Sequence, residues 1–136
     1  MAVPAQVVDC FSDQRWRLNN LYWIIDKNGD RVPFRLNWAQ IDLLDKMHYL
    51  NLVLKARQLG FTWIVLAYAL WRLLFHPIST VLLFSQRDKD ATALLGVRLR
   101  GMYNHLPGWM KVGEPVGLAD SDHEWELSHG SRALAF

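Results

Sequence analysis

Cysteine is nearly absent from this chain, which has only Cys10 among its 136 residues. A single thiol excludes a disulfide framework and a zinc site built from several thiolates. The five histidines are scattered, and no two are spaced i, i+4, the separation that places two side chains on one face of a helix. We therefore expect no metal site that is held by protein ligands alone.

The chain also lacks a long apolar run and a large excess of charges of one sign. The apolar run over residues 61–71 is too short to span a bilayer and is followed by Arg72. Residues 1–6 lack the charged and apolar regions of a secretory signal peptide. The formal net charge of +2 is nearly balanced and says little about partners. We expect a soluble, cytoplasmic protein that does not bind membranes.

Hydrophobic residues, in contrast, make up 51% of the chain, and seven residues are tryptophan. This composition excludes a disordered chain. A length of 136 residues is sufficient for one domain with a hydrophobic core.

The first part of the chain predicts a helix and a β-hairpin. The helix is expected over residues 4–16. Residues 21–25 and 32–36 are rich in apolar residues and enclose Asn28-Gly29, a pair that tolerates positive φ and favours a hairpin turn. The acidic residues around this turn do not form a calcium loop, because Gly29 is misplaced for that spacing.

A second helix is predicted from Asn37 to about Tyr49. Asn37 is a good N-cap, and Gln40 three residues later completes a capping box. Gln40 also has a functional interpretation, because a glutamine amide matches the donor and acceptor of adenine N6 and N7. Trp38 or Phe34 would then stack on the base. Spacing alone leaves both roles of Gln40 open.

The centre of the chain is predicted to be a strand, a tight polar loop and a helix. Residues 50–54 form an apolar run broken by Asn51, and residues 61–75 are apolar enough for a packed helix. Between them lies Lys-Ala-Arg-Gln-Leu-Gly-Phe-Thr, residues 55–62. Unpaired N–H groups at a helix N-terminus bind phosphate, and this is the context of a phosphate-binding loop.

This loop departs from the usual G-x-x-x-x-G-K-[ST] pattern. Gly60 and Thr62 occupy the second glycine and the hydroxyl position, but Phe61 stands at the lysine position and Lys55 at the first glycine position. A lysine side chain can reach the phosphates from either end of a curled loop. The alternative is a turn in which Gly60 caps a strand and Thr62 caps a helix.

The remaining elements follow from apolar patterning. His76-Pro77 ends the central helix, and residues 79–84 read as a parallel strand that would complete a βαβ unit with residues 50–54. A helix is predicted over residues 88–105, with Arg98 and Arg100 off its apolar stripe and solvated. Two strands, residues 125–127 and 132–136, are expected around a turn at residues 128–131.

Taken together, four stretches resemble a known family. They are residues 19–26 (NNLYWIID), residues 37–40 (NWAQ) and residues 52–62 (LVLKARQLGFT), followed by residues 129–132 (HGSR). The chain resembles the N-terminal ATPase domain of the large terminase subunit of tailed bacteriophages, the motor that drives DNA into a procapsid. The resemblance extends from about Asp13 to the last residue.

The resemblance implies a nucleotide site with ATP and Mg²⁺. Gln40 would contact adenine, Lys55 would neutralise phosphate charge, and Thr62 would ligate Mg²⁺. The amides of residues 58–61 would cradle the phosphates, and Arg57 would stabilise the transition state in the manner of an arginine finger, unless it forms a surface ion pair. The implied nucleotide contacts are Gln40, Lys55, Ala56, Arg57, Gln58, Leu59, Gly60, Phe61 and Thr62.

The chain also departs from the family. Hydrolysis needs an apolar strand that ends in a magnesium-binding Asp beside a catalytic Glu. The apolar run over residues 81–84 is followed by Ser-Gln-Arg, residues 85–87, instead. Asp120, Asp122, Glu124 and Glu126 follow a glycine-rich loop, and His129 stands where the family commonly has Asn. We therefore expect an incomplete α/β domain, a P-loop NTPase core with a parallel sheet, without its Walker B strand or the nuclease domain.

We expect a helix and hairpin over residues 1–36 and the front part of the ATPase domain over residues 37–136. The complete motor would act in the host cell cytoplasm as a homo-oligomer, with double-stranded DNA, the small terminase subunit and the portal protein as partners. Two alternatives stay open. One is a non-catalytic remnant or binding module that contacts DNA or terminase subunits, and the other is a helicase-like P-loop ATPase.

Overall fold

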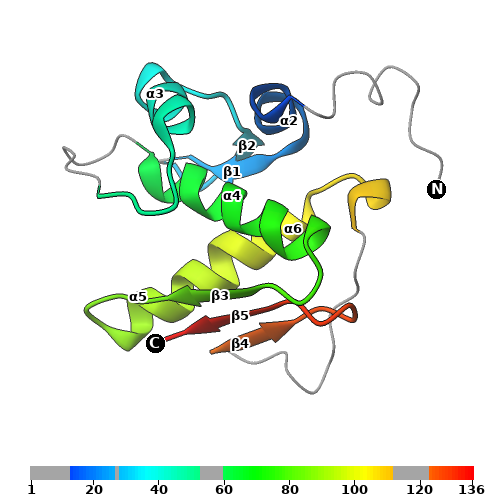
Figure 1. The fold of residues 1–136 in the computed structure, drawn as a ribbon. Coiled ribbons are helices and arrows are strands. Elements are labelled where there is room, and N and C mark those ends of the chain that lie inside the picture. The colour runs from blue at the N-terminus through cyan, green and yellow to red at the C-terminus, as the bar shows by residue number, and fades with distance from the viewer. Residues whose placement is uncertain (1–12, 27, 53–59, 112–122) are drawn as a thin grey trace.

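The computed structural model describes residues 13–26, 28–52, 60–111 and 123–136. These residues form a mixed α/β structure (Figure 1), as the sequence predicts. In chain order the elements are α2 (Gln14–Leu21), β1 (Trp23–Ile25), β2 (Arg31–Pro33), α3 (Trp38–Lys46), α4 (Phe61–Phe75), β3 (Thr80–Leu83), α5 (Asp88–Ala93), the π-helix η1 (Leu94–Arg100), α6 (Gly101–Asn104), the 3-10 helix η2 (Gly108–Met110), β4 (Glu124–Glu126) and β5 (Arg132–Ala135).

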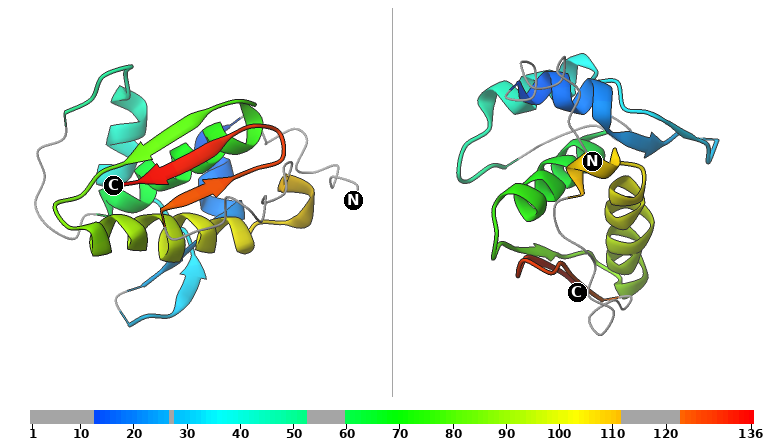
Figure 2. Two further views of the ribbon diagram at one scale, coloured as in Figure 1. Left: turned by 90° about the horizontal axis from the view of Figure 1, so that it is seen from below. Right: turned by 90° about the vertical axis from the view of Figure 1, so that its right-hand side faces the viewer.

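The elements stack in three layers. Figure 2 shows α4 side by side with the continuous helix α5–η1–α6, and these two helices cover one face of the sheet β3-β5-β4. On the other side of α4 lie α2, α3 and the hairpin β1–β2 (Figure 1). The opposite face of the sheet is not covered by any element that the structure describes (Figure 2). Helices α4 and α5–η1–α6 therefore form the middle layer of the molecule.

The sheet has the order β3-β5-β4, and its pairing differs from the prediction. Strand β3 is parallel to β5, with Thr80 opposite Arg132, and β4 is antiparallel to β5. The two C-terminal strands are thus confirmed. The parallel partner of β3 comes after it in the chain, through the α5–η1–α6 crossover, and not before it. A βαβ unit around α4 is not formed by the described residues.

The helix predicted over residues 4–16 is described only from residue 13 onward, where α2 begins at Gln14. Asp13 Oδ1 accepts hydrogen bonds from the backbone N–H groups of Arg15 (3.0 Å) and Trp16 (3.4 Å), so this side chain fixes the start of α2. The helix then continues to Leu21 instead of ending at residue 16. The part of the prediction over residues 4–12 lies outside the described residues.

The hairpin is confirmed with shorter strands. Strands β1 and β2 are antiparallel, with Ile24 opposite Val32. In the turn, Asp26 Oδ1 accepts from the N–H groups of Asn28 and Asp30, each at 2.9 Å, and Gly29 has φ +86°. The Asp26 carboxylate therefore serves the turn, as a hairpin requires.

The buried strand predicted over residues 50–54 is wrong for residues 50–52, which are irregular. Leu50 and Leu52 are 78% and 91% exposed. The cause is Asn51, whose Oδ1 accepts from His48 N–H (2.9 Å) and whose Nδ2 donates to the His48 carbonyl (2.6 Å). Such local side-chain bonds compete with a strand ladder. Helix α3 ends at Lys46, earlier than the predicted end near Tyr49. Residues 53 and 54 of the predicted strand lie outside the described residues.

Helix α4 has the predicted bounds and supplies the centre of the core. His76, whose N–H donates to the Arg72 carbonyl (3.0 Å), terminates it immediately before Pro77. Its buried side chains are Ile64, Leu66, Ala67, Ala69, Leu70, Leu73 and Leu74. Although apolar, α4 is not a transmembrane candidate, and neither is any other helix in the described ranges.

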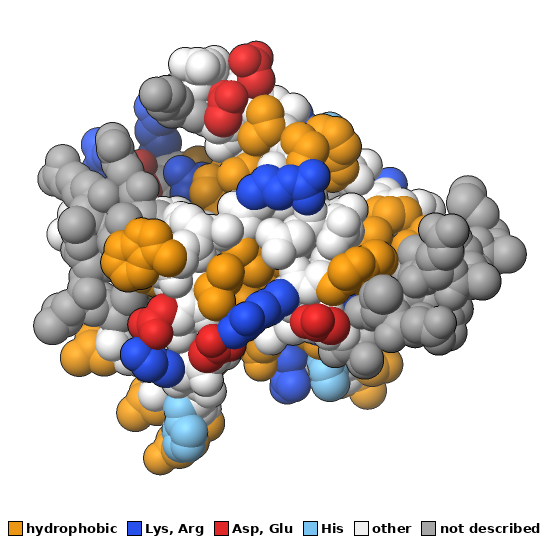
Figure 3. All heavy atoms as spheres, turned by 90° about the horizontal axis from the view of Figure 1, so that it is seen from above, with side chains coloured by type: hydrophobic (Ala, Val, Ile, Leu, Met, Phe, Trp, Pro, Cys, Tyr) orange, Lys and Arg blue, Asp and Glu red, His pale blue; other side chains and the backbone are white. Residues whose placement is uncertain are grey.

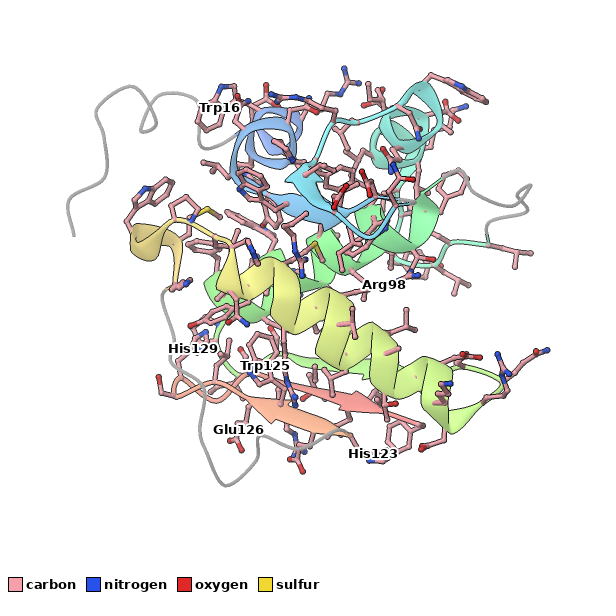
Figure 4. All side chains as sticks on the ribbon, turned by 180° about the vertical axis from the view of Figure 1, so that it is seen from behind. Trp16, Arg98, His123, Trp125, Glu126 and His129 are labelled. Atoms are coloured by element: carbon pink, nitrogen blue, oxygen red, sulfur yellow. The ribbon has the colours of Figure 1, made fainter. Side chains whose placement is uncertain are left out.

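The turn between β4 and β5 contacts the C-terminal end of α4. His129 Nε2 lies 3.1 Å from the Leu74 carbonyl, and the Ser131 hydroxyl donates to the His76 carbonyl at 3.3 Å. Gly130 has φ +94°, in the left-handed region that favours glycine. In Figure 4, His129 lies near the end of α4, and Trp125 and Glu126 leave β4 on opposite faces of the sheet. The His-Gly-Ser stretch thus joins the sheet to the end of α4.

Candidate functional site

The start of α4 differs from the starts of α2 and α3. Helices α2 and α3 begin at Asp13 and Asn37, whose side chains accept hydrogen bonds from the first backbone N–H groups. Helix α4 begins at Gly60, which has φ +75° and offers no side-chain cap. The N–H groups of the first turn of a helix have no partner within the helix. An anionic ligand can therefore bind at this end of α4.

Gln40 holds the Gly60 end of α4 in place. Its Oε1 accepts from the backbone N–H of Asn37 (2.9 Å), and its Nε2 donates to the Gly60 carbonyl (2.9 Å). The Asn37 side chain in turn accepts from Gln40 N–H (2.9 Å), so the predicted capping box is formed. Only 3% of Gln40 is exposed. The side chain thus couples α3 to α4.

Gly60 is required for its backbone angle and for space. A Cβ atom at this position would lie 2.5 Å from Gln40 Nε2, well inside van der Waals contact. A positive φ is also unfavourable for residues with a side chain. Both constraints require glycine at the last position before α4.

A cavity of ≈ 430 Å³ lies between α3 and Phe61, and we name it the α3 hollow. Its volume falls within the range of about 300–1,000 Å³ that is usual for small-molecule sites. Its lining combines an aromatic ring with a polar rim that carries both signs of charge. The lining residues are Ala39, Asp42, Leu43, Lys46, His48, Leu50, Asn51, Leu52 and Phe61.

A second cavity, of ≈ 360 Å³, lies on the side of α4 that faces α5 and η1, and we name it the Thr62 cavity. It is lined by Thr62, Ser85, Asp90, Ala93, Leu94 and Arg98. Consecutive residues of α4, Phe61 and Thr62, therefore line different cavities. The start of α4 lies between them.

The described residues bring part of the predicted site together. Gly60, Phe61 and Thr62 lie at the start of α4, and Gln40 of α3 contacts Gly60 there. The rest of the predicted loop, Lys55, Ala56, Arg57, Gln58 and Leu59, lies outside the described residues. Of the two aromatic residues predicted to stack on a base, Phe34 is fully buried in the core and is not accessible, whereas Trp38 is exposed.

Two arginines that the sequence analysis expected to be solvated are half-buried. Arg100 Nη2 donates to the Glu124 carbonyl at 2.8 Å and so ties η1 to β4. Arg98 lies with its guanidinium carbon 5.1 Å from the centroid of the Trp63 ring, a cation–π contact with the first turn of α4. The helical pattern placed both arginines off the apolar stripe but carried no signal of these contacts.

The acidic residues do not assemble a metal site within the described part of the chain. No group of three or more His, Cys, Asp or Glu residues that could hold a metal ion is found there. Glu124 and Glu126 lie in β4, and Asp120 and Asp122 are outside the described residues. Asp90, which the sequence analysis did not single out, is the acidic residue that shares a cavity with Thr62.

Comparison with known proteins gives no family assignment. No protein-family model matches the chain, and no curated protein matches it either.

Proposed function

We propose that this chain is the ATP-binding portion of a DNA-packaging motor, the large terminase subunit of a tailed bacteriophage. One observation carries the proposal, the hydrogen bond from buried Gln40 to the carbonyl of Gly60 at the start of α4. It joins two of the motifs that carry the sequence resemblance, NWAQ and KARQLGFT. A capped helix that positions the end of a phosphate-binding loop is an arrangement that nucleotide binding can use.

In this proposal the phosphates bind where α4 begins. The uncapped first turn of α4 offers N–H donors to phosphate oxygens. Lys55 neutralises their charge, the amides of residues 58–61 surround them, and Thr62 ligates the Mg²⁺ that ATP brings. Arg57 stabilises charge that develops during phosphoryl transfer.

The base has a candidate position in the α3 hollow. Phe61 lines this cavity and begins α4, so a nucleotide with phosphates at the helix start could place its base there. Gln40 uses one N–H and one acceptor position within the protein. Its amide retains a second N–H and a second lone pair, but Gln40 is 3% exposed and does not line the α3 hollow, so an adenine contact in this proposal requires its side chain to turn toward the cavity.

Hydrolysis and DNA translocation belong to the complete motor in this proposal. Phosphoryl transfer gains its rate from positioned metal ions and a residue that orients the attacking water. On the face in Figure 3, basic side chains lie singly or beside acidic and hydrophobic ones. Contacts with double-stranded DNA, the small terminase subunit and the portal protein are assigned to the assembled oligomer in this proposal.

Nucleotide binding by the 136-residue chain tests the proposal. We expect weak but saturable, magnesium-dependent binding of a fluorescent ATP analogue, which Lys55→Ala removes. The matched control is Lys89→Ala, because Lys89 is exposed on α5 and lines neither cavity. Equal binding by wild type and Lys55→Ala, with unchanged circular dichroism, would contradict the proposal.

A phosphate-release assay on the same proteins tests catalysis. We expect no turnover above buffer controls. Magnesium-dependent turnover that Lys55→Ala abolishes would show that an acidic residue of this chain, such as Asp120 or Glu124, performs the role assigned to the Walker B pair.

The alternative of a binding module has one observation in its favour. One face of the sheet is not covered by any described element (Figure 2), and Leu82, Phe84 and Phe136, in or beside β3 and β5, are all at least half exposed. An apolar face of this kind is typical of an interaction surface. A chain that binds no nucleotide but associates through this face would support the alternative.

A further inference from the structure

The Thr62 cavity contains a charge that the proposed function does not use. Arg98 enters it from η1, half-buried and in contact with the Trp63 ring. Figure 4 shows that Arg98 points from this helix toward α4. Its guanidinium is therefore held beside the first turn of the helix that carries Thr62.

The acidic residue of the same cavity already has a partner. Arg87 donates to both carboxylate oxygens of Asp90, from Nε at 2.9 Å and from Nη2 at 3.3 Å. Arg98, in contrast, has no carboxylate within ion-pair distance among the residues that the structure describes. The lining itself carries one positive and one negative charge, and counting Arg87 beside Asp90 leaves Arg98 as the charge that favours an anionic ligand.

The other polar groups of the cavity fit a phosphate. Thr62 and Ser85 contribute hydroxyl groups, which can donate to phosphate oxygens or ligate a phosphate-bound metal ion. A guanidinium offers several N–H donors in a planar fork that matches a phosphate group. The lining comes from α4, the end of β3, α5 and η1, so four parts of the chain converge on this space.

The local backbone around Arg98 is also unusual. Arg98 lies within the π-helical segment Leu94–Arg100, while Leu95 and Leu99 of this segment are fully buried. Segments of π-helix change the direction of side chains and are frequent at functional sites. The buried leucines fix the segment, and Arg98 is presented to α4.

We propose that Arg98 binds the terminal phosphate of the nucleotide in the Thr62 cavity and so distinguishes ATP from ADP. This proposal rests on the proposed function. Phe61 lines the α3 hollow on one side of the start of α4, and Thr62 lines the other cavity. A nucleotide with its base in the α3 hollow extends its phosphates across the start of α4 toward Arg98. In this proposal the third phosphate, which ADP lacks, is the one that contacts the guanidinium.

The test compares ATP, ADP and inorganic tripolyphosphate in competition with a fluorescent ATP analogue. Because Arg98→Gln removes a charged hydrogen bond, it should weaken the affinities for ATP and tripolyphosphate by about tenfold to a hundredfold. ADP should be affected less than about threefold, within the range of a neighbouring charge. Arg98→Lys, which keeps the charge but loses the fork, should fall between wild type and Arg98→Gln.

The matched control is Arg132→Gln, because Arg132 is exposed on β5 and lines neither cavity. It should leave all three affinities unchanged. If Arg98→Gln lost the same affinity for ATP as for ADP, or lost none, the role of Arg98 would be overturned. Binding of ATP by wild type would still support the proposed function in that case. Absence of ATP binding by wild type, in contrast, would reject the proposed function itself.

A second measurement decides the question if Arg98→Gln does not fold. Because Arg98 lies over the Trp63 ring, tripolyphosphate should change tryptophan fluorescence in wild type, and Trp63→Phe should remove most of that change. A signal that survives in Trp63→Phe would place the phosphate away from Arg98.

Discussion

Gln40 Nε2 donates a hydrogen bond to the carbonyl of Gly60, and a Cβ at Gly60 would lie 2.5 Å from the same nitrogen. The two residues are twenty positions apart and belong to different elements, so each constrains the other. The contact explains why a polar side chain is buried at this point. It also makes the start of α4 sensitive to a single methyl group.

Gly60→Ala should therefore disturb the site more than a usual glycine substitution. The left-handed conformation alone costs about 1–2 kcal/mol for a residue with a side chain, and the new methyl group displaces Gln40. We expect a lower melting temperature and loss of nucleotide binding. The control is Gly96→Ala in η1, where a Cβ would meet nothing within 4 Å. That control should be neutral or stabilising by up to about 1 kcal/mol; equal effects of the two variants would contradict this account.

Gln40→Ala separates the structural from the functional role of Gln40. Loss of the capping box and of the bond to Gly60 should lower the free energy of unfolding by about 1–2 kcal/mol. We further predict that ATP binding weakens more than binding of bare triphosphate, because only ATP carries an adenine for the amide to contact. Calorimetry with both ligands measures the difference. Equal losses would leave Gln40 with its structural role alone.

The displaced lysine predicts a rescue. Phe61 stands at the position where the usual loop has lysine, and it begins α4. If Lys55→Ala removes phosphate binding, adding Phe61→Lys should restore part of it, because an ammonium group at the helix start can reach the same phosphates. Titration with tripolyphosphate measures the recovery. The control is Leu50→Lys, which adds a lysine elsewhere in the α3 hollow; recovery by both variants would indicate a general charge effect.

The elements that the sequence predicted well are those determined by local signals. Helix α4 begins directly after Gly60 and ends before Pro77, and Asn28-Gly29 produces the hairpin turn. Each of these signals acts over a few residues. The capping box of Asn37 and Gln40 belongs to the same class.

The predictions that were wrong involve either local side-chain bonds that compete with a strand or contacts between residues far apart in the sequence. Asn51 uses its side chain in a turn with His48, so the apolar residues beside it do not form the predicted strand. The pairing of β3 with β5 joins residues about fifty positions apart, and no local pattern selects one partner strand over another. For the same reason the contact of Arg98 with Trp63 was not predicted.

Tyr22 predicts a loss of stability at alkaline pH. Burial raises the pKa of its phenol well above the ordinary value, partly opposed by the positive charge of Arg17. A raised pKa in the folded state means that the neutral form is stabilised by folding, so its contribution is complete below about pH 10 and is lost as the pH rises further. Tyr22→Phe should flatten the alkaline limb of a pH–stability curve. Tyr49→Phe, at an exposed tyrosine, should leave it unchanged.

The uncovered face of the sheet predicts self-association. Strand β3 lies at the edge of the described sheet, one face of which no described element covers, and the rings of Phe84 and Phe136, beside β3 and β5, stack with centroids 5.0 Å apart. Unpaired strand edges and exposed apolar faces promote pairing between chains. We expect light scattering to show a mass that increases with concentration, and Phe84→Lys to reduce it. The control is Val97→Lys, at an exposed apolar residue on η1 away from the sheet. A monodisperse wild type, or equal effects of the two variants, would show that this face does not drive association.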